Sequence, residues 1–513
     1  MTEAAQDAVV TFLLDPATHG VSGPVEVIDT HISRVFLAGA RAYKLKRAVL
    51  LPYTDASTPG KRLANCRKEY DLNRRTAPDL YLAVRRITRA PDGSPEFDGE
   101  GPLLDAVVEM VRFDQEALFD RMAERDDLAP GMMGELAATV VRHHSEAPVV
   151  HSGSGSGNIA AVLDINLAGF HTSDLFCAAE IERLDAAFRS GLERHREELD
   201  AREAAGLVRR CHGDLHLRNI CLFEGRATLF DCIEFSDQLA TVDVLYDLAF
   251  LLMDLWHREK RGFANLVANR YFDAAKSDDG YALLAFFMAL RAAVRAHVTA
   301  TFAIEADDER ASQESAARSY FDLAEVLLEE QPAHVLAIGG LSGSGKSTVA
   351  KATAPRLGAA PGARLLESDR QRKALFGVPS ETRLPQGAYA DDVSEKVYGM
   401  LADRAARLAA SGASVIVNAV YDRAARRDAL EGAVKRHDFT GVWLHAAPET
   451  LRDRLIERPK GASDATLAIL ETQLEADTGP MTWRAVSSEG DVAATVDAVL
   501  TAVRSDMRGS RLS

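Results

Sequence analysis

One stretch of the chain brings acidic and amide side chains together at the ends of two apolar runs. The runs span residues 219–223 and 227–230, and the Glu-Gly-Arg turn between them predicts a β-hairpin. Asp214 and Asn219 stand at its start, and Asp231 directly follows its second strand. A carboxylate can accept a hydroxyl proton, and carboxylate and amide oxygens are ligands that Mg²⁺ prefers. The stretch therefore predicts phosphoryl transfer, in which metal ions neutralise the charge of the moving group.

The motif HGDLHLRN, followed by FDCIEF, resembles the catalytic motif and metal-binding Asp of aminoglycoside phosphotransferases and related small-molecule kinases, which share the protein-kinase fold. Its spacing, H-x-D-x-x-x-x-N, is that of the kinase catalytic loop. The resemblance implies that Asp214 is the catalytic base and that Asn219 and Asp231 hold magnesium. The alternative is a solvent-facing hairpin with incidental acids, and the specific order of the residues argues against it.

The composition of the 513-residue chain, 47% hydrophobic and 27% charged, is that of a soluble protein with two or more domains. The formal net charge of −16 argues against a nucleic-acid partner, whereas ATP can still be met by local cations, Mg²⁺ and backbone N–H groups. The N-terminus lacks a signal-peptide pattern and no apolar run reaches membrane-spanning length, so we expect a cytoplasmic protein with no membrane partner. Five cysteines without metal-ligand spacing fit a reducing compartment, and the oligomeric state is open.

Upstream strands must supply a cation for the nucleotide phosphates. Residues 35–37 and 42–45 predict a hairpin around Gly39, with Lys44 in its second strand and Lys46 on the same face. In kinases a strand lysine grips the ATP phosphates and pairs with a helix glutamate. We prefer Lys44 for this role and keep Lys46 as its rival; two solvated strand lysines are the structural alternative.

A helix predicted over residues 59–76 offers Glu69 as the partner of that lysine. Strands are predicted at residues 80–89 and 103–112. Surface helices also carry glutamates routinely, so the alternative is that Glu69 is an ordinary surface residue of this helix.

The segment at residues 114–205 predicts mostly helices. It is interrupted by the Gly/Ser-rich residues 151–158, which we interpret as a flexible loop rather than a phosphate-binding one. Asp243 and Asp247 open a later apolar helix, where they either brace the catalytic loop or act as acids at a helix N-terminus.

The stretches HISRVFLAGARAYKLKRAV and RLANCRKEYDLNRRTAPDLYLAV resemble a bacterial family of fused proteins. In that family an aminoglycoside-phosphotransferase-like domain is joined to a P-loop kinase domain. The resemblance covers most of the chain and implies two nucleotide sites, but the family as a whole has no agreed substrate.

An apolar strand at residues 335–338 runs into G-x-x-x-x-G-K-S at residues 340–347 and then into a helix, which is the context that a P-loop requires. Lys346 is expected to reach the β- and γ-phosphates and Ser347 to bind Mg²⁺. A flexible Gly/Ser linker would lack the flanking strand and helix. The expected nucleotide-binding residues are Gly340, Gly343, Ser344, Gly345, Lys346, Ser347 and Thr348.

The stretch ARLLESDRQRKALFG resembles the second-strand motif of small P-loop kinases, such as gluconate, shikimate and chloramphenicol kinases. We expect Asp369 at the end of that strand. The resemblance implies that Asp369 acts as a base or in the metal shell and that Arg372 contacts the acceptor. A helix N-cap is the alternative role of Asp369.

A buried parallel strand is predicted at residues 413–420, where related kinases often carry an Asp at the position of Asn418. An amide cannot take a proton, so this departure questions a Walker-B role. Arg454 and Arg458 lie one helical turn apart and are expected to line a lid over the phosphates; a solvated basic helix face is the alternative.

Together these patterns predict an α+β, two-lobed, protein-kinase-like domain at residues 1–330, with an N-lobe at about 1–112 and a C-lobe at about 113–330. It is fused to an α/β P-loop domain with a parallel sheet at residues 334–513. The predicted function is ATP- and Mg²⁺-dependent transfer to a small hydroxylated molecule, such as a sugar, amino sugar or aminoglycoside, with a second kinase or ATPase site making the chain bifunctional. The alternatives are a protein-kinase-like domain regulated by a non-catalytic P-loop sensor, and a scaffold with degenerate sites.

Overall fold

The chain divides into two compact units. One consists of residues 1–168 and 189–258, and the other of residues 169–188 and 259–513. The boundaries of these units differ from the predicted domain boundaries. The predicted domains therefore remain a prediction. The computed structural model describes residues 6–30, 32–51, 54–305, 309–457 and 464–510.

The first unit is built around a six-stranded antiparallel sheet with the strand order β1-β2-β3-β8-β6-β7. Helices α1 and α2 pack against its opposite faces. A short pair, β4 with β5, lies outside this sheet. The elements are α1 (Asp7–Leu14), β1 (Glu26–Asp29), β2 (Ser33–Ala38), β3 (Arg41–Lys46), β4 (Leu50–Leu51), β5 (Thr54–Asp55), α2 (Pro59–Asn73), β6 (Tyr81–Arg89), β7 (Pro95–Phe97) and β8 (Leu103–Val111).

Alternation along β3 decides which face each side chain occupies. Tyr43 and Leu45 belong to the apolar cluster on the α1 side, whereas Ala42 belongs to the cluster on the α2 side. Because side chains alternate along a strand, Lys44 and Lys46 both face α2. The predicted hairpin and helix are confirmed, and they place two lysines beneath one helix.

The remainder of the first unit is mostly helical and carries two short antiparallel strand pairs, β9 with β12 and β10 with β11. Its elements are α3 (Phe119–Glu124), α4 (Pro130–Glu146), α5 (Gly155–Phe170), α6 (Ala178–Ala204), β9 (Val208–Arg210), β10 (Ile220–Phe223), β11 (Arg226–Leu229), α7 (Asp237–Ala240), β12 (Thr241–Asp243) and α8 (Val244–His257). Helices α5 and α6 run across the division between the units.

The β10–β11 pair is the predicted hairpin. Phe223 is opposite Arg226, so the turn consists of Glu224 and Gly225 alone, and Arg226 belongs to the second strand. Both turn residues have positive φ, 49° and 76°, as the tight turns of two-residue hairpins require.

The prediction of a loop over residues 151–158 is wrong for its second half, because α5 begins at Gly155. Asp200 of α6 explains the helix start: its carboxylate accepts hydrogen bonds from the Ser156 N–H at 2.9 Å and from the Ser154 hydroxyl at 3.1 Å. A residue 44 positions away in the sequence thus accepts a hydrogen bond from the backbone at this helix N-terminus. The Gly/Ser-rich local sequence alone predicts a linker.

The second unit contains a five-stranded parallel sheet with the strand order β14-β15-β13-β16-β17. Its core is apolar, with Leu336, Ile338, Ile416, Val442 and Val499 fully or almost fully buried. The predicted parallel sheet is confirmed. The strands are β13 (His334–Gly340), β14 (Arg364–Glu367), β15 (Val415–Asn418), β16 (Asp438–His445) and β17 (Arg484–Ser487).

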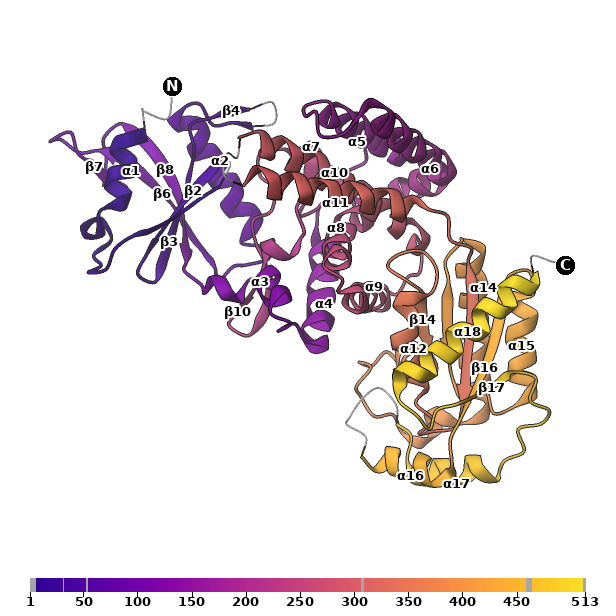
Figure 1. Cartoon of the computed structure of the whole chain (residues 1–513). Coiled ribbons are helices and arrows are strands. Elements are labelled where there is room, and N and C mark those ends of the chain that lie inside the picture. Colours follow the sequence, from indigo (N-terminus) through magenta and orange to yellow (C-terminus); the bar gives the residue numbers. More distant parts are fainter. Residues whose placement is uncertain (1–5, 31, 52–53, 306–308, 458–463, 511–513) are drawn as a thin grey trace. The chain divides into compact units, whose positions relative to one another are not determined.

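Some helices of this unit flank the sheet (Figure 1), and others come before it in the sequence. They are α9 (Arg261–Ala275), α10 (Leu284–Glu305), α11 (Arg310–Leu328), α12 (Lys346–Thr353), α13 (Ser368–Leu375), α14 (Asp391–Ala410), α15 (Ala424–Val434), α16 (Pro448–Ile456), α17 (Leu467–Glu475) and α18 (Val492–Ser510).

A buried arginine fixes α9 to the edge strand β14. The Arg364 side chain is fully buried and binds Asp273 at 2.6 Å and Asp278 at 2.9 Å. Burial alone would lower the pKa of Arg364, but these two carboxylates raise it. Asp278 also pairs with Arg404 of α14, so the loop after α9 is tied to two elements of the P-loop fold.

Among the described residues, one helical segment, Tyr281–Ile304, is long and apolar enough to cross a membrane by length and composition. The expectation that no apolar run reaches membrane-spanning length was wrong for this segment. Within the structure 78% of its most apolar window is buried, as in the core helix of a globular unit.

Candidate active sites

The first site is a buried cluster of two lysines and three carboxylates beneath α2. Lys44 Nζ lies 2.8 Å from Glu69 Oε1 and 2.5 Å from Asp231 Oδ1. Lys46 Nζ lies 2.5 Å from Glu69 Oε2 and 2.5 Å from Glu234 Oε1. The two rivals therefore share Glu69, but the contact with Asp231 belongs to Lys44.

The charges of this cluster stabilise one another. Burial alone would lower the pKa of Lys44, but Asp231 and Glu69 raise it well above its usual value. Burial alone would raise the pKa of Glu69, but Lys44 and Lys46 lower it. Both lysines are therefore cationic and Glu69 anionic at neutral pH, as phosphate binding by Lys44 requires.

Asp231 sits at the mouth of the cluster, with 38% of its side chain exposed. Its backbone is in the left-handed region, with φ of 63°. The Asp231 N–H donates to Tyr81 Oη at 3.2 Å, and the Cys232 N–H donates to Asn73 Oδ1 at 2.8 Å. Asn73 in turn donates to the carbonyl of Glu69, so α2 positions Asp231 and the lysine partner together.

Tyr81 and Asn73 were not among the predicted site residues. Asn73 carried a usable signal, because it follows Glu69 by one helical turn. Tyr81, which lies 150 residues before Asp231, carried none.

The catalytic loop joins Asp214 to Asn219. The Asn219 side-chain amide donates to Asp214 Oδ2 and to the Asp214 carbonyl, both at 2.9 Å. His216 Nε2 lies 3.3 Å from the same Oδ2. This arrangement leaves the amide oxygen as the atom that Asn219 can offer to a metal.

Asp247 and His212 brace this loop. Asp247, fully buried in α8, accepts hydrogen bonds from the Gly213 N–H at 2.7 Å and the His212 N–H at 3.3 Å. His212 Nε2 lies 2.9 Å from the Phe230 carbonyl, and burial lowers the pKa of this histidine. Gly213 has φ of 86°, and a Cβ there would lie 3.0 Å from Ala240 and Ile233. Of the two roles weighed for Asp247, bracing of the catalytic loop is the one that its contacts show.

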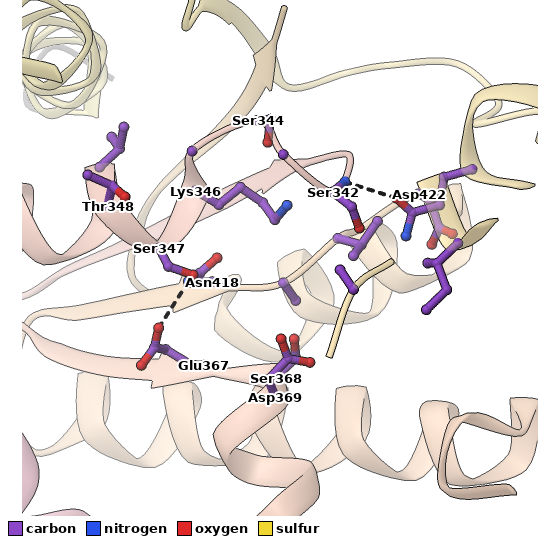
Figure 2. Close-up of a pocket in the computed structure, with 18 of the residues that line it drawn as sticks. Ser342, Ser344, Lys346, Ser347, Thr348, Glu367, Ser368, Asp369, Asn418 and Asp422 are labelled. Atoms are coloured by element: carbon purple, nitrogen blue, oxygen red, sulfur yellow. Dashed lines mark hydrogen bonds between the residues drawn. The ribbon is translucent and has the colours of Figure 1, made fainter. Parts of the chain in front are cut away.

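The second site is a cavity of about 770 Å³ around the P-loop (Figure 2). Six of the predicted nucleotide-binding residues line it: Gly343, Ser344, Gly345, Lys346, Ser347 and Thr348. The seventh, Gly340, ends β13 and is not among the lining residues; a Cβ there would lie 2.4 Å from the Leu444 carbonyl. Gly340 thus permits close packing of β13 and β16 rather than contact with the cavity.

Lys346 and Ser347 open helix α12 and line the cavity. Lys346 Nζ donates to the Leu341 carbonyl at 2.8 Å, within the loop itself. The Ser344 hydroxyl is buried without a hydrogen-bond partner among the described residues. The Ser344 side chain is 1% exposed and lies toward Gly340, where an added Cβ would be 2.7 Å from its hydroxyl oxygen, so it packs within the loop.

The placement of Asp369 at a strand end is wrong by two residues. Strand β14 ends at Glu367, and Asp369 lies in the first turn of α13 without a side-chain cap at that helix end. Asp369 lines the cavity from α13 (Figure 2). Glu367, which sequence reasoning did not single out, takes the strand-end position.

Arg372 and Arg454 also line this cavity. The Arg372 side chain is buried, donates to the Ala388 carbonyl at 2.7 Å and stacks over Tyr389 at 4.8 Å. Arg454 donates to the Ser488 carbonyl at 2.6 Å. Arg458, the other predicted lid residue, lies outside the described residues.

The first site lies in a kinase-like fold and the second in a P-loop fold. Residues 58–287 match the model of the phosphotransferase enzyme family, and residues 335–480 match that of the AAA domain family. The chain thus joins a phosphotransferase domain of the kinase-like fold to a P-loop kinase-like domain, and the predicted fusion is confirmed.

Similar proteins cover nearly the whole chain. Uncharacterized proteins of Mycobacterium tuberculosis and Mycobacterium bovis are each 29% identical over 474 residues, covering 89% of this chain and 91% of theirs. A gluconokinase from Sinorhizobium meliloti is 25% identical over 36% of this chain and 99% of its own, with a TM-score of 0.27. A choline/ethanolamine kinase family protein from Mesorhizobium loti is 16% identical over 63% of this chain and 94% of its own, with a TM-score of 0.41.

Proposed function

We propose that this protein is an ATP- and Mg²⁺-dependent phosphotransferase that acts on a hydroxyl group of a small molecule, such as a sugar, an amino sugar or an aminoglycoside, through its first domain. The observation that carries the proposal is the joining of Lys44, Glu69 and Asp231 across 187 residues of sequence, beside a loop that pairs Asp214 with Asn219. The P-loop domain holds a second nucleotide and runs its own kinase or ATPase reaction.

Each residue of the first site has a separate role in the proposed reaction. Lys44, held by Glu69, grips the nucleotide phosphates, and Asp214 orients the acceptor hydroxyl and accepts its proton. The donor set of Asp231 and Asn219, a carboxylate and an amide oxygen, fits a hard divalent cation. Magnesium bound there would neutralise charge on the transferring phosphoryl group.

In the P-loop domain, Lys346 and the loop N–H groups bind the phosphates, and Ser347 holds magnesium. Asp369 faces the same cavity as Arg372, which suits a base near an acceptor with an anionic group. Arg454 adds positive charge at the rim of the cavity.

A second function has one specific observation in its favour. Asn418 stands where a strand-end carboxylate is common in related kinases, which supports a P-loop domain that senses nucleotide and regulates a protein-kinase-like neighbour. Radiolabelled ATP added with whole lysate tests this version, since labelled protein bands support it and labelled small molecules alone exclude it.

The proposal itself is tested by an ATP-consumption screen over sugars, amino sugars, nucleosides and aminoglycosides. Wild type is compared with Asp214→Ala and Lys346→Ala. An acceptor whose turnover is lost in Asp214→Ala and retained in Lys346→Ala belongs to the first domain. Absence of acceptor-dependent turnover across all these classes, with both sites binding ATP, would contradict the choice of acceptor class.

The two strand lysines give a paired prediction. Lys44→Met is expected to lower kcat/KM for ATP in the first domain by about 100-fold, because the phosphates lose a cation. Lys46→Met is expected mainly to lower the unfolding temperature, because Glu234 then lies buried without its cation. Steady-state kinetics and thermal unfolding of both variants check this. The reverse pattern would make Lys46 the phosphate-gripping residue.

A further inference from the structure

Helix α9 and the loop after it belong to one part of the chain by sequence and to another by contact. Residues 259–287 fall within the stretch that matches the phosphotransferase family, yet they lie in the same compact unit as the P-loop fold. The Asn265 side-chain amide donates to the Ala363 carbonyl at 3.0 Å, and the Tyr281 hydroxyl donates to the Gly362 carbonyl at 3.0 Å. This segment therefore satisfies backbone groups just before β14, the edge strand of the parallel sheet.

One acid of this segment is connected to a helix that lines the P-loop cavity. Asp278, in the loop after α9, binds the Arg404 guanidinium of α14 with both oxygens, at 2.7 Å from Nε and 2.9 Å from Nη2. The remaining nitrogen, Arg404 Nη1, donates to Gln371 Oε1 of α13 at 2.5 Å. Gln371 is only 7% exposed. A single planar group thus connects the loop after α9 to α13.

The charge of Asp278 fixes the orientation of Arg404. Burial alone would raise the pKa of Asp278, but the hydrogen bonds from Arg404 and the charge of Arg364 lower it. Asp278 is therefore anionic at neutral pH. Its two oxygens match two N–H groups of the guanidinium, whereas a neutral amide has one oxygen to accept them.

Helix α13 connects these contacts to the cavity. Asp369 and Arg372 line the cavity, and both lie within two positions of Gln371 on this helix. The first turn has a second connection to α9, because Arg370 lies 3.9 Å from Asp273. Since α13 has eight residues and no side-chain cap at its start, packing rather than helix propensity sets its orientation. A small rotation of α13 would move both cavity-lining side chains.

We propose that Asp278 is a positioning residue for the acceptor side of the P-loop site, acting through Arg404 and Gln371 on α13. The reaction of the P-loop domain then depends on a residue from the stretch that matches the phosphotransferase family. The inference rests on the proposed function of the P-loop domain, and it adds to that site a residue outside 334–513.

The test is ATP turnover by the full chain in an Asp214→Ala background, which silences the first domain, with water alone and with the acceptor classes of the screen. The turnover that Lys346→Met removes belongs to the P-loop. Asp278→Asn is expected to lower the kcat of this turnover by about 10- to 100-fold, because α13 no longer holds its side chains in place. ATP binding at the P-loop, followed by calorimetry, is expected to be unchanged, because Lys346 lies on α12.

A neighbouring acid provides the matched control. Asp279 is exposed and accepts from the Ser277 hydroxyl at 3.0 Å. Asp279→Asn removes the same charge from the same loop and is expected to change neither kcat nor ATP binding.

A double-substitution cycle separates this connection from a general loss of stability. Gln371→Met removes the α13 end of the connection, leaves the ion pair of Asp278 with Arg404 in place, and is expected to lower kcat as Asp278→Asn does. The two substitutions together are expected to cost no more than the more severe one alone, because both break the same connection. If Asp278→Asn does not fold, Gln371→Met alone decides, and a wild-type kcat in that variant overturns the inference.

Three other results would also overturn it. The first is a wild-type kcat in folded Asp278→Asn, and the second is losses from the two substitutions that multiply. The third is a loss of ATP binding in parallel with kcat, which would assign Asp278 to the stability of the fold. If Lys346→Met removes no turnover at all, the proposed reaction of the P-loop domain fails, and the inference fails with it.

Discussion

Asp214→Asn is expected to lower kcat for the acceptor of the first domain by about 10²- to 10⁴-fold, the usual contribution of a general base. The substitution keeps the shape of the side chain but removes its ability to take a proton. The Asp214 side chain is 38% exposed and is held by Asn219, so its charge is not needed for core packing. We therefore expect unchanged thermal unfolding and almost unchanged binding of ATP, because Asp214 serves the acceptor rather than the phosphates.

The measurement is steady-state turnover with the acceptor found in the screen, together with calorimetry for ATP. Asp164→Asn is the matched control, since Asp164 is 70% exposed and forms a surface ion pair with Arg189. Turnover by Asp214→Asn within about tenfold of wild type would show that another group takes the proton.

Arg364→Met is expected to destabilise the second unit by about 3–5 kcal/mol, the usual cost of removing one partner of a buried ion pair. The Arg364 side chain is fully buried and Met leaves Asp273 without its partner at 2.6 Å. Asp278 keeps Arg404 and Asp273 keeps Arg270 at 3.1 Å, so the cost falls on the Asp273 Oδ1 atom, which loses Arg364, and on Asn269, whose Oδ1 accepts from Arg364 at 2.8 Å.

Chemical denaturation followed by tryptophan fluorescence measures this loss in a Trp256→Phe background, in which the signal comes from Trp443 and Trp483, in and beside the parallel sheet. Arg356→Met is the control, because Arg356 and its partner Asp497 are 48% and 65% exposed, and such pairs contribute about 1 kcal/mol or less. Equal losses in the two variants would mean that the buried network does not hold α9 to β14.

Local patterns in the sequence predicted the fold well. The β10–β11 hairpin and the P-loop each depend on residues that lie close together in the sequence. The spacing of those residues is therefore enough to identify both elements. The parallel sheet follows from apolar strands that alternate with helices. These elements are the ones that position Asp214, Asn219 and Lys346.

Features that depend on contacts between residues far apart in the sequence could not be predicted from local patterns. Lys44 and Lys46 share a face of β3, and only the position of Asp231, 187 residues later, distinguishes them. The strand end at Glu367 rather than Asp369 depends on the register with β15, which local propensity does not specify. The helical start at Gly155 depends on Asp200, and the grouping of α9 with the parallel sheet depends on Arg364, whose partners precede it by more than 80 residues.

The central claim is that this chain holds two nucleotides in separate pockets, and a calorimetric titration of the full chain with ATP and Mg²⁺ tests it most directly. We predict two molecules of ATP bound per chain, with Lys44→Met removing one of them and Lys346→Met removing the other. Binding of a single ATP that both substitutions abolish, or of none, would contradict the account.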